Sequence, residues 1–363
     1  MIQTTFDDLR EFAEYATSHA QDQYVSLYLN TDPADPENRA QTPAWQIYLK
    51  NAIATIEQNL DPVQTRQWKN VRLRDTDPDK AWARTRKRLE KYLTSFRPKA
   101  KTLALFISQG SEHRFELPVR LDNVHYYGEP HMQEILWAMD EYELHLVVLM
   151  AEDEARMMHI GLGQTADDAT VVVDQRSWRQ GRKGMNVPTL EARRDELTRR
   201  FVRMVAADVD KHFFKEHDVE RIILGGDQRL ANSLLSQLHP AVREKVIGVL
   251  PIPIDRPAHE IVSRTRDVAE QAEREYEDGL VTEVVSQAGA RGRGAAGTVA
   301  VSHALDRAAV RLLLLPYPAA DDIEPLLLQA VHQGAQVEFL HGEPAEQAAA
   351  AGGVLAQLYY AIN

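Results

Sequence analysis

Basic residues and glycines are concentrated in one polar segment, QRSWRQGRKGMNVP, at residues 175–188. Lys and Arg side chains bind phosphate groups, and glycines permit the unusual backbone angles with which a loop can follow a nucleic-acid strand. Trp178 adds an aromatic surface on which a base can stack. The segment is therefore expected to contact RNA, and a solvated surface loop is the alternative. The residues expected to make this contact are Arg176, Arg179, Gly181, Arg182, Lys183 and Gly184.

A long basic helix is expected to follow this segment, with Thr189 as its N-cap and Pro188 just outside it. Arg193, Arg200 and Arg203 fall off the apolar stripe of this helix, so they are expected to stay on the surface and to extend the RNA contact. The stripe repeats every four residues and consists of Leu197, Phe201, Val205, Val209 and Phe213.

Two glycine-rich motifs have structural explanations that are simpler than catalytic ones. GRGAAG (292–297) matches the dinucleotide-binding pattern, but no clear hydrophobic strand precedes it and no ribose-binding acid ends the next strand. LGGDQ (224–228) closes a buried-type strand, where paired glycines serve a tight turn into a helix. No cofactor is therefore expected.

The remaining residues show no catalytic or metal-binding pattern. His145 and His159 could face each other across a predicted hairpin, but a third ligand is missing, so no metal site is expected. No nucleophile–base pair, carboxylate dyad or phosphate-binding loop stands out. No catalytic residue is predicted from the residue types alone.

Charge is distributed unevenly along this chain of 363 residues, whose formal net charge is −12. Such a net charge argues against nucleic-acid binding unless the two signs are segregated. Residues 84–101 hold eight basic residues and one acid, and residues 176–203 hold nine basic residues and three acids. Both islands could bind RNA phosphates, although solvated helix faces are the alternative.

The cellular setting follows from what the sequence lacks. There is no cysteine, which excludes disulfides and thiolate catalysis and suits the cytoplasm. No apolar run approaches the roughly 18–20 residues that cross a bilayer, and the first residues do not read as a secretory signal. A cytoplasmic protein without a membrane partner is expected.

Strands alternate with helices, which predicts an α/β protein. Three domains are expected, at residues 1–142, 143–278 and 279–363. The predicted strands are 24–30, 102–108, 113–119, 144–150, 155–161, 170–174, 221–227, 246–252, 310–317 and 335–342. The other predicted helices are 6–19, 43–60, 78–96, 229–238, 257–278, 298–308 and 321–333. The last two strands should be parallel, with helix 321–333 between them.

The order of elements from residue 143 onward resembles the middle and C-terminal domains of the archaeo-eukaryotic release factors and Pelota. QGRKGMN (180–186) and LEARRDELTRRF (190–201) are similar to the Gly-Gly-Gln loop of release factors and the Arg-rich helix after it. GAAGTVAVSHALDRAAVRLLLLP (294–316) and GGVLAQLYY (352–360) resemble the start and end of the C-terminal domain. VSLYLNTDP (25–33) resembles the bacterial branch of this superfamily.

The resemblance implies a mixed α/β N-terminal domain, a middle domain with a mixed sheet and long helices, and a C-terminal domain like a ribosomal-protein α-β-α sandwich. It implies a translation factor that binds the ribosome, rRNA or tRNA in termination, rescue or quality control, and leaves a translational GTPase open as a partner.

The sequence departs from the release factors at the residues that carry their activity. The Gly-Gly-Gln tripeptide and the stop-codon motif Asn-Ile-Lys-Ser are both absent. Asn186 offers an amide one methylene shorter than Gln, and it is only a weak catalytic candidate. Binding without Gly-Gly-Gln hydrolysis is expected, and whether the chain is an enzyme stays open. Peptidyl-tRNA hydrolysis by a divergent loop and a protein-interaction module that kept the fold are the alternatives.

Overall fold

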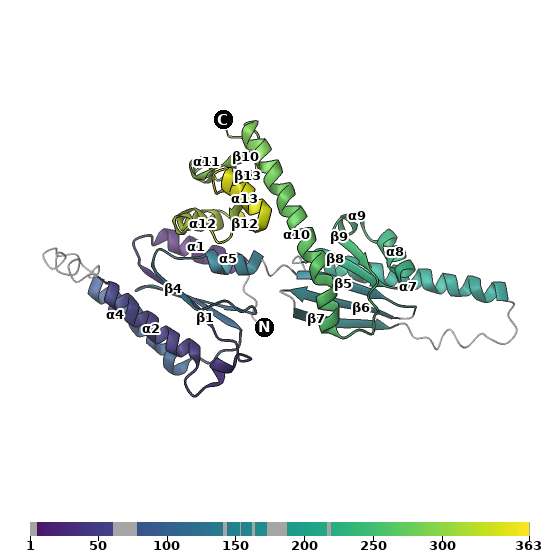
Figure 1. Cartoon of the computed structure of the whole chain (residues 1–363), viewed down its shortest axis with the longest axis horizontal. Helices are drawn as coiled ribbons and strands as arrows, with labels where there is room; N and C mark the ends of the chain where they lie inside the picture. Colours follow the sequence, from purple (N-terminus) through teal and green to yellow (C-terminus); the bar gives the residue numbers. More distant parts are fainter. Residues whose placement is uncertain are drawn as a thin grey trace. The chain divides into compact units, whose positions relative to one another are not determined.

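The computed structural model describes residues 6–60, 78–140, 144–152, 154–161, 164–172, 187–215 and 219–362 (Figure 1). The chain forms two compact units. The first combines residues 1–140 with residues 277–363, and the second comprises residues 141–276. The expected α/β class is confirmed, because the described residues form three sheets that are accompanied by helices.

The N-terminal part of the first unit is built on a four-stranded antiparallel sheet with the order β3-β2-β1-β4. Its strands are β1 (Tyr24–Asn30), β2 (Thr102–Ile107), β3 (Glu112–Leu117) and β4 (Val124–Gly128). Its helices are α1 (Phe6–Ser18), η1 (Pro36–Arg39), α2 (Ala44–Asn59), α4 (Pro78–Ser95) and α5 (Gln133–Asp140). The sequence predicted most of these elements, but not β4, η1 or α5.

Helices cover both faces of this sheet, which explains why every residue of β1 is buried. Val25, Leu27 and Leu29 pack with the apolar sides of α2 and α4. The alternate residues of β1 face the other side, where Phe12 of α1 lies against Tyr24 and Phe106.

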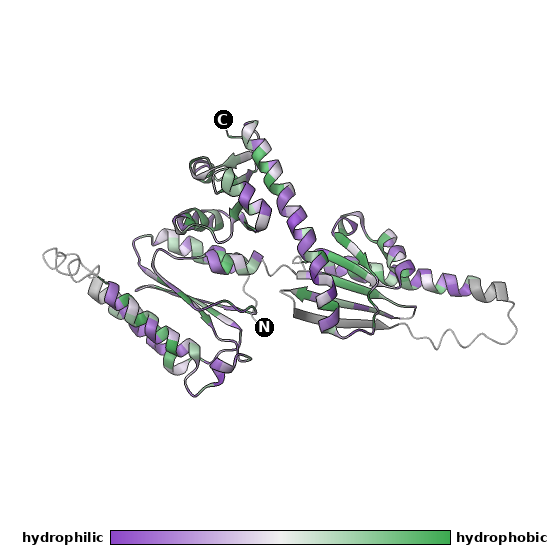
Figure 2. Cartoon of the chain, in the orientation of Figure 1, coloured by the Kyte–Doolittle hydropathy of each residue, from purple (hydrophilic) through white to green (hydrophobic). Residues whose placement is uncertain are grey.

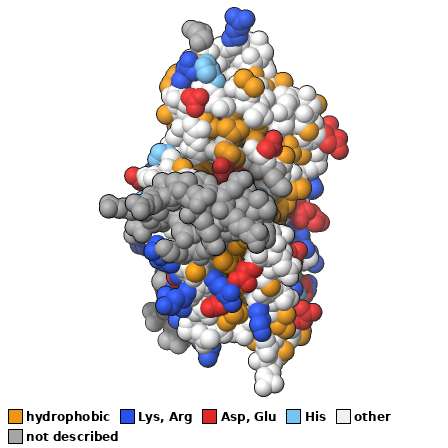
Figure 3. All heavy atoms as spheres, turned by 90° about the vertical axis from the view of Figure 1, so that its left-hand side faces the viewer, with side chains coloured by type: hydrophobic (Ala, Val, Ile, Leu, Met, Phe, Trp, Pro, Cys, Tyr) orange, Lys and Arg blue, Asp and Glu red, His pale blue; other side chains and the backbone are white. Residues whose placement is uncertain are grey.

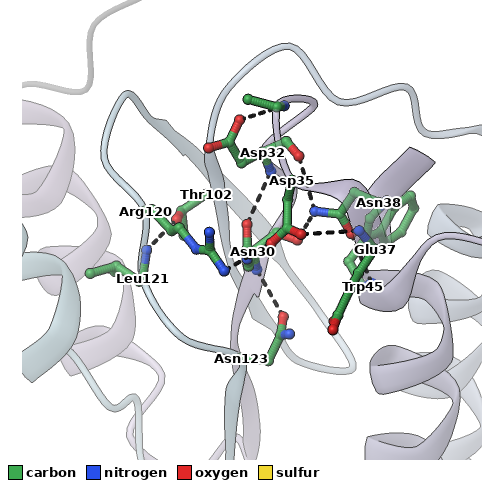
Figure 4. A network of polar contacts seen from close by, with 11 residues as sticks. Asn30, Asp32, Asp35, Glu37, Asn38, Trp45, Thr102, Arg120, Leu121 and Asn123 are labelled. Carbon is green, nitrogen blue, oxygen red and sulfur yellow. Dashed lines mark hydrogen bonds and ion pairs between the residues drawn. The ribbon is translucent and has the colours of Figure 1, made fainter. Parts of the chain in front are cut away.

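A polar network secures the end of β1, where the TDPADPEN segment begins (Figure 4). Asp35 lies at its centre: its Oδ2 accepts from Asn30 Nδ2 at 2.9 Å and lies 2.8 Å from an Arg120 guanidinium nitrogen. Asn38 Nδ2 donates to the carbonyl of Asn30 at 2.9 Å, and the N–H of Asn30 donates to Asn123 Oδ1 at 2.8 Å. The network therefore ties the end of β1 and the segment after it to residues 120–123, which precede β4.

The C-terminal part of the first unit is a second four-stranded sheet, with the order β10-β13-β11-β12. The predicted parallel β-α-β arrangement is confirmed, since β11 and β12 run parallel and α12 connects them. The strands are β10 (Gly294–Ala296), β11 (Val310–Pro316), β12 (Gln336–Leu340) and β13 (Leu355–Leu358). The helices are α11 (Thr298–Leu305), η3 (Asp321–Ile323), α12 (Glu324–His332) and α13 (Gly342–Ala350).

The second unit holds a five-stranded mixed sheet with the order β7-β6-β5-β8-β9, in which β5, β8 and β9 are parallel. Its strands are β5 (Leu144–Met150), β6 (Glu154–Gly161), β7 (Gln164–Val172), β8 (Val219–Gly226) and β9 (Val246–Leu250). Its helices are α7 (Val187–Lys215), α8 (Gln228–Gln237), α9 (Pro240–Arg243) and the first part of α10 (Ala258–Gly289). One core lies between the sheet and α7 and α8, and another packs around Ile261 and Val262 of α10.

The paired glycines of LGGDQ form the predicted turn from strand to helix. Gly226 has φ +87°, and a Cβ there would lie 2.0 Å from the carbonyl oxygen of Met150. A Cβ on Gly225 would lie 2.8 Å from the carbonyl oxygen of Leu250. Asp227 then caps α8 by accepting from the N–H of Leu230 at 3.0 Å. The structural reading of this motif is confirmed.

The prediction for the long charged helix was wrong at its end, because α10 continues to Gly289 instead of stopping near residue 278. Leu280, Val281 and Val284 are buried against the C-terminal sheet, and this tertiary packing outweighs the helix-weakening effect of Gly279. The predicted boundary between the second and third domains therefore falls inside one helix, and the three-domain division stays a prediction.

Hydrophobic residues are frequent in the strands, while long helices such as α4 and α10 carry many hydrophilic residues (Figure 2). Among the described residues, no helix combines the length and the apolar character that crossing a bilayer requires.

Candidate nucleic-acid interface

The predicted RNA-binding segment lies between β7 and α7. The structure does not describe residues 173–186. The predicted RNA contacts and the weak catalytic candidate in this segment therefore lie outside the described residues: Arg176, Arg179, Gly181, Arg182, Lys183, Gly184 and Asn186. The arginines of α7 lie within the described part of the chain.

Helix α7 starts at Val187, so the prediction of Thr189 as N-cap was wrong. Pro188 lies in the first turn instead of outside the helix. A proline fits there because its missing N–H would have no partner inside the helix.

The apolar stripe of α7 packs onto the sheet as predicted from Phe201 onward, whereas Leu197 is half-buried and lies outside this core. Phe201, Val205 and Val209 are at most 3% exposed and lie in the core with Leu146 and Leu224. This packing begins at Phe201, whereas residues 192–196 are all exposed. The sheet therefore fixes the second half of the helix, and the first half presents its side chains to solvent.

Arg193, Arg200 and Arg203 are all exposed. At about 100° per residue, Arg193, Arg200 and Arg203 lie within about 80° of each other around the helix axis, on the side opposite to the buried stripe. The ten residues from Arg193 to Arg203 span about 15 Å along the axis. The three guanidinium groups thus form one row, which we name the α7 arginine row. None of the three has an ion-pair partner among the described residues, whereas Arg194 pairs with Glu152.

The electrostatics of this surface favour an anion. Glu196 is exposed on the same side of the helix, so the α7 arginine row keeps an excess of two positive charges. Guanidinium groups bind phosphate with two parallel hydrogen bonds, and they are always charged near neutral pH. A phosphate backbone fits these properties.

The described residues do not bring together a metal site, since no group of three or more His, Asp or Glu side chains there could hold an ion. The idea that His145 and His159 face each other was wrong. His145 pairs with Ile160 in the β5–β6 ladder, and His159 pairs with Leu146. Because neighbouring residues of a strand point to opposite faces, the two imidazoles lie on opposite sides of the sheet. Burial, reinforced by the charge of Arg221, lowers the pKa of His145 to about 4.

The first unit contains a buried polar cluster that sequence reasoning missed. His131 lies between two carboxylates: its Nδ1 is 3.1 Å from Glu324 Oε1, and its Nε2 is 3.2 Å from Glu134 Oε2. Tyr126 stacks on the imidazole and donates to Glu134 Oε1 at 2.5 Å. Burial raises the pKa of Glu324 to about 7, against the opposing effect of His131. No local pattern could reveal this cluster, because Glu324 and His131 lie in segments far apart in the chain.

A family model and a curated protein match parts of the chain. Residues 130–293 match the model of bacterial archaeo-eukaryotic release factor family 10. An uncharacterized protein of Bacillus subtilis, YocB, is 23% identical over 251 residues, which are 66% of this chain and 91% of YocB.

Solved structures of Pelota and Dom34 are similar to this chain at low sequence identity. Archaeoglobus fulgidus Pelota is 16% identical with a TM-score of 0.34, over 74% of this chain and 83% of that one. Dom34 of S. cerevisiae, described as a translation termination-like factor, is 14% identical with a TM-score of 0.42, over 70% and 74% of the two chains. The predicted resemblance to the bacterial archaeo-eukaryotic release factors is confirmed through the family model of family 10, which residues 130–293 of this chain match.

Proposed function

We propose that this protein binds the ribosome or tRNA as a release-factor-like factor in translation termination, rescue or quality control, and that it does so without Gly-Gly-Gln hydrolysis. The observation that carries the proposal is the α7 arginine row. It projects from the sheet of a segment that matches a release factor family, and it directly follows the cationic residues 176–183 in sequence.

The arrangement of α7 supports a role in binding. Arginines that served only stability would be expected to pair with neighbouring acids, as Arg194 pairs with Glu152. Arg193, Arg200 and Arg203 leave their charge exposed instead. Exposed guanidinium groups in a row neutralise phosphates and release condensed counterions, which makes binding favourable and dependent on salt.

The proposal of binding without hydrolysis rests on the sequence. The only adjacent glycines before the C-terminal segment are Gly225 and Gly226, and these form the turn from β8 into α8. Asn186 has no pair of glycines before it. The proposal includes a cytoplasmic location, three domains at 1–142, 143–278 and 279–363 with a ribosomal-protein-like C-terminal fold, and a translational GTPase as a partner to be sought.

Ribosome co-sedimentation over a range of salt concentrations tests the proposal. A variant with Arg193→Gln, Arg200→Gln and Arg203→Gln removes the row. Each lost phosphate contact should lower the slope of log affinity against log salt by about 0.7 to 0.9, so the slope should fall by about 2 to 3. The affinity at low salt should fall by about tenfold or more.

A matched control keeps the row and removes three exposed arginines elsewhere in the second unit, with Arg229→Gln, Arg264→Gln and Arg266→Gln. This control changes the net charge equally and should bind like the wild type. Equal binding by the row variant and the wild type would instead favour a protein-interaction module.

A further inference from the structure

A second surface of the molecule concentrates positive charge, and it lies in the first unit on the helical layer formed by α2 and α4. Residues 44–59 and 81–101 contain nine basic residues and two acids, in a chain whose formal net charge is −12. Figure 3 shows Lys and Arg side chains exposed on this side of the molecule.

Glu57 and Glu90, the two acids within residues 44–59 and 81–101, bind the same arginine. Arg86 Nη1 lies 2.7 Å from Glu57 Oε1 of α2, and Arg86 Nε lies 2.8 Å from Glu90 Oε1 of α4. The pKa of Arg86 is raised by its hydrogen bond with Glu90 and by the charge of Glu57. Glu57 and Glu90 are therefore both used by one guanidinium, and neither forms an ion pair with Arg84, Lys87, Arg88 or Lys91.

Four of these other cations form one row on α4. Arg84, Lys87, Arg88 and Lys91 follow the spacing i, i+3, i+4, i+7, which places them on a single side of a helix. We name this row the α4 stripe. The opposite side of α4 is anchored in the core by Trp82, Leu89 and Tyr92.

The α4 stripe is open to solvent. Arg84, Lys87 and Lys91 are exposed, and Arg88 is half-buried with its guanidinium 3.4 Å from the carbonyl oxygen of Gly110. None of the four has a carboxylate partner among the described residues. The stripe extends about 10 Å along the helix, and exposed Arg97 and Lys99 continue the positive surface beyond the helix end.

We propose that the α4 stripe binds the phosphate backbone of RNA, as a second contact besides the α7 arginine row. The inference extends the proposed function by assigning an RNA-binding surface to the first unit. The stripe contains only Lys and Arg, whereas protein interfaces need buried apolar or aromatic anchors and are depleted in Lys. Membrane-surface helices likewise insert an apolar face, and the apolar side of α4 is already buried in the core. Protein–nucleic acid interfaces are polar and strongly positive, as this surface is.

The test measures binding of the full chain to a fluorescently labelled single-stranded RNA of about 20 nucleotides, by anisotropy at several salt concentrations. The stripe variant carries Arg84→Gln, Lys87→Gln, Arg88→Gln and Lys91→Gln. Its slope of log affinity against log salt should fall by about 3, since each phosphate contact contributes about 0.7 in single strands. Affinity at low salt should fall by about tenfold or more.

A control with the same change of net charge carries Arg10→Gln, Arg39→Gln, Arg307→Gln and Arg311→Gln, which are exposed arginines of the same unit outside the layer. The control should keep the wild-type slope. Circular dichroism and thermal unfolding of both variants establish that they are folded, which the surface positions lead us to expect.

Several results would overturn the proposal. The stripe variant could bind RNA as the control does, or the wild type could fail to bind this RNA at all. Stripe-dependent binding to polyglutamate or to vesicles with anionic lipids, stronger than binding to RNA, would assign the stripe to an acidic protein or a membrane instead. Loss of binding in the stripe variant alone, with the α7 row variant unchanged, would support the stripe and contradict the proposed function's α7 contact. The reverse result would reject the stripe and leave that contact standing.

Discussion

Glu324 accepts two backbone hydrogen bonds from a segment 192 residues earlier in the chain: Met132 N–H donates to its Oε2 at 2.7 Å, and Gln133 N–H donates to its Oε1 at 3.1 Å. These N–H groups belong to the start of α5, where donors have no partner inside the helix. Ala319 N–H donates back to Gln133 Oε1 at 2.9 Å. The N-terminal and C-terminal parts of the first unit are thus joined through buried polar contacts.

Substitution Glu324→Gln should change how the stability of the first unit depends on pH. Burial raises the pKa of this carboxyl to about 7 from its ordinary 4.5, so the folded state favours its protonated form. The stability of the wild type relative to the variant should be greatest below pH 4.5 and should fall as the pH rises to 7, by at most about 3 kcal/mol. Urea unfolding at several pH values measures this difference.

The control for that substitution is Glu343→Gln, which removes an exposed carboxylate from the same unit. It should not reproduce the pH dependence expected of Glu324→Gln. A Glu324→Gln difference that does not change with pH would contradict the assignment of a raised pKa to this carboxyl.

The second unit should respond to acid through His145. Burial and Arg221 lower the pKa of its imidazole to about 4, so the folded state favours the neutral form. The stability that the neutral form contributes is present above pH 6.5 and should be lost as the pH falls through 4. Between pH 6.5 and 4 the free energy of unfolding of the wild type should fall by up to about 3 kcal/mol relative to that of His145→Gln. His259→Gln, at an exposed site of the same unit, is the control and should give no such loss on urea unfolding.

Gly226→Ala should destabilise the second unit strongly. Its φ of +87° disfavours any side chain, and the added Cβ would lie 2.0 Å from the backbone oxygen of Met150 in the adjacent strand β5. We expect a loss of about 3 kcal/mol or more in the free energy of unfolding. Gly279→Ala is the matched change, because a Cβ there meets nothing within 4 Å and the residue lies inside helix α10. That variant should be more stable than the wild type by roughly 0.5 to 1 kcal/mol. Similar effects of the two substitutions would refute the steric argument.

The comparison of sequence and structure shows which features are encoded locally. The four-residue repeat from Phe201 to Val209 predicted the buried side of α7, and the glycines at 225 and 226 predicted a tight turn. Both predictions succeeded because periodicity and backbone freedom are properties of a short segment.

Features that depend on tertiary packing were missed. His145 was expected to face His159, but it pairs with the next residue, Ile160. A shift of one residue along a strand moves the side chain to the opposite face of the sheet. The contact between Met132 and Glu324 had no local signal. The surface position of Arg193, Arg200 and Arg203 was predictable, whereas the use of both Glu57 and Glu90 by Arg86 required the structure.

Peptide release should be absent. We expect the wild type to release no peptide from stalled ribosome complexes beyond the rate without protein, since the Gly-Gly-Gln tripeptide is missing. Single-turnover release, measured alongside Asn186→Ala, checks this expectation. Release by the wild type that the substitution abolishes would make the protein a peptidyl-tRNA hydrolase and Asn186 part of its mechanism.

The central claim is that the α7 arginine row contacts RNA on the ribosome. Cryo-electron microscopy of ribosomes incubated with the protein measures this most directly. The account predicts density for the chain in which Arg193, Arg200 and Arg203 lie within hydrogen-bonding distance of rRNA or tRNA phosphates. Ribosomes without bound protein, or a bound protein whose α7 faces solvent or another protein, would contradict it.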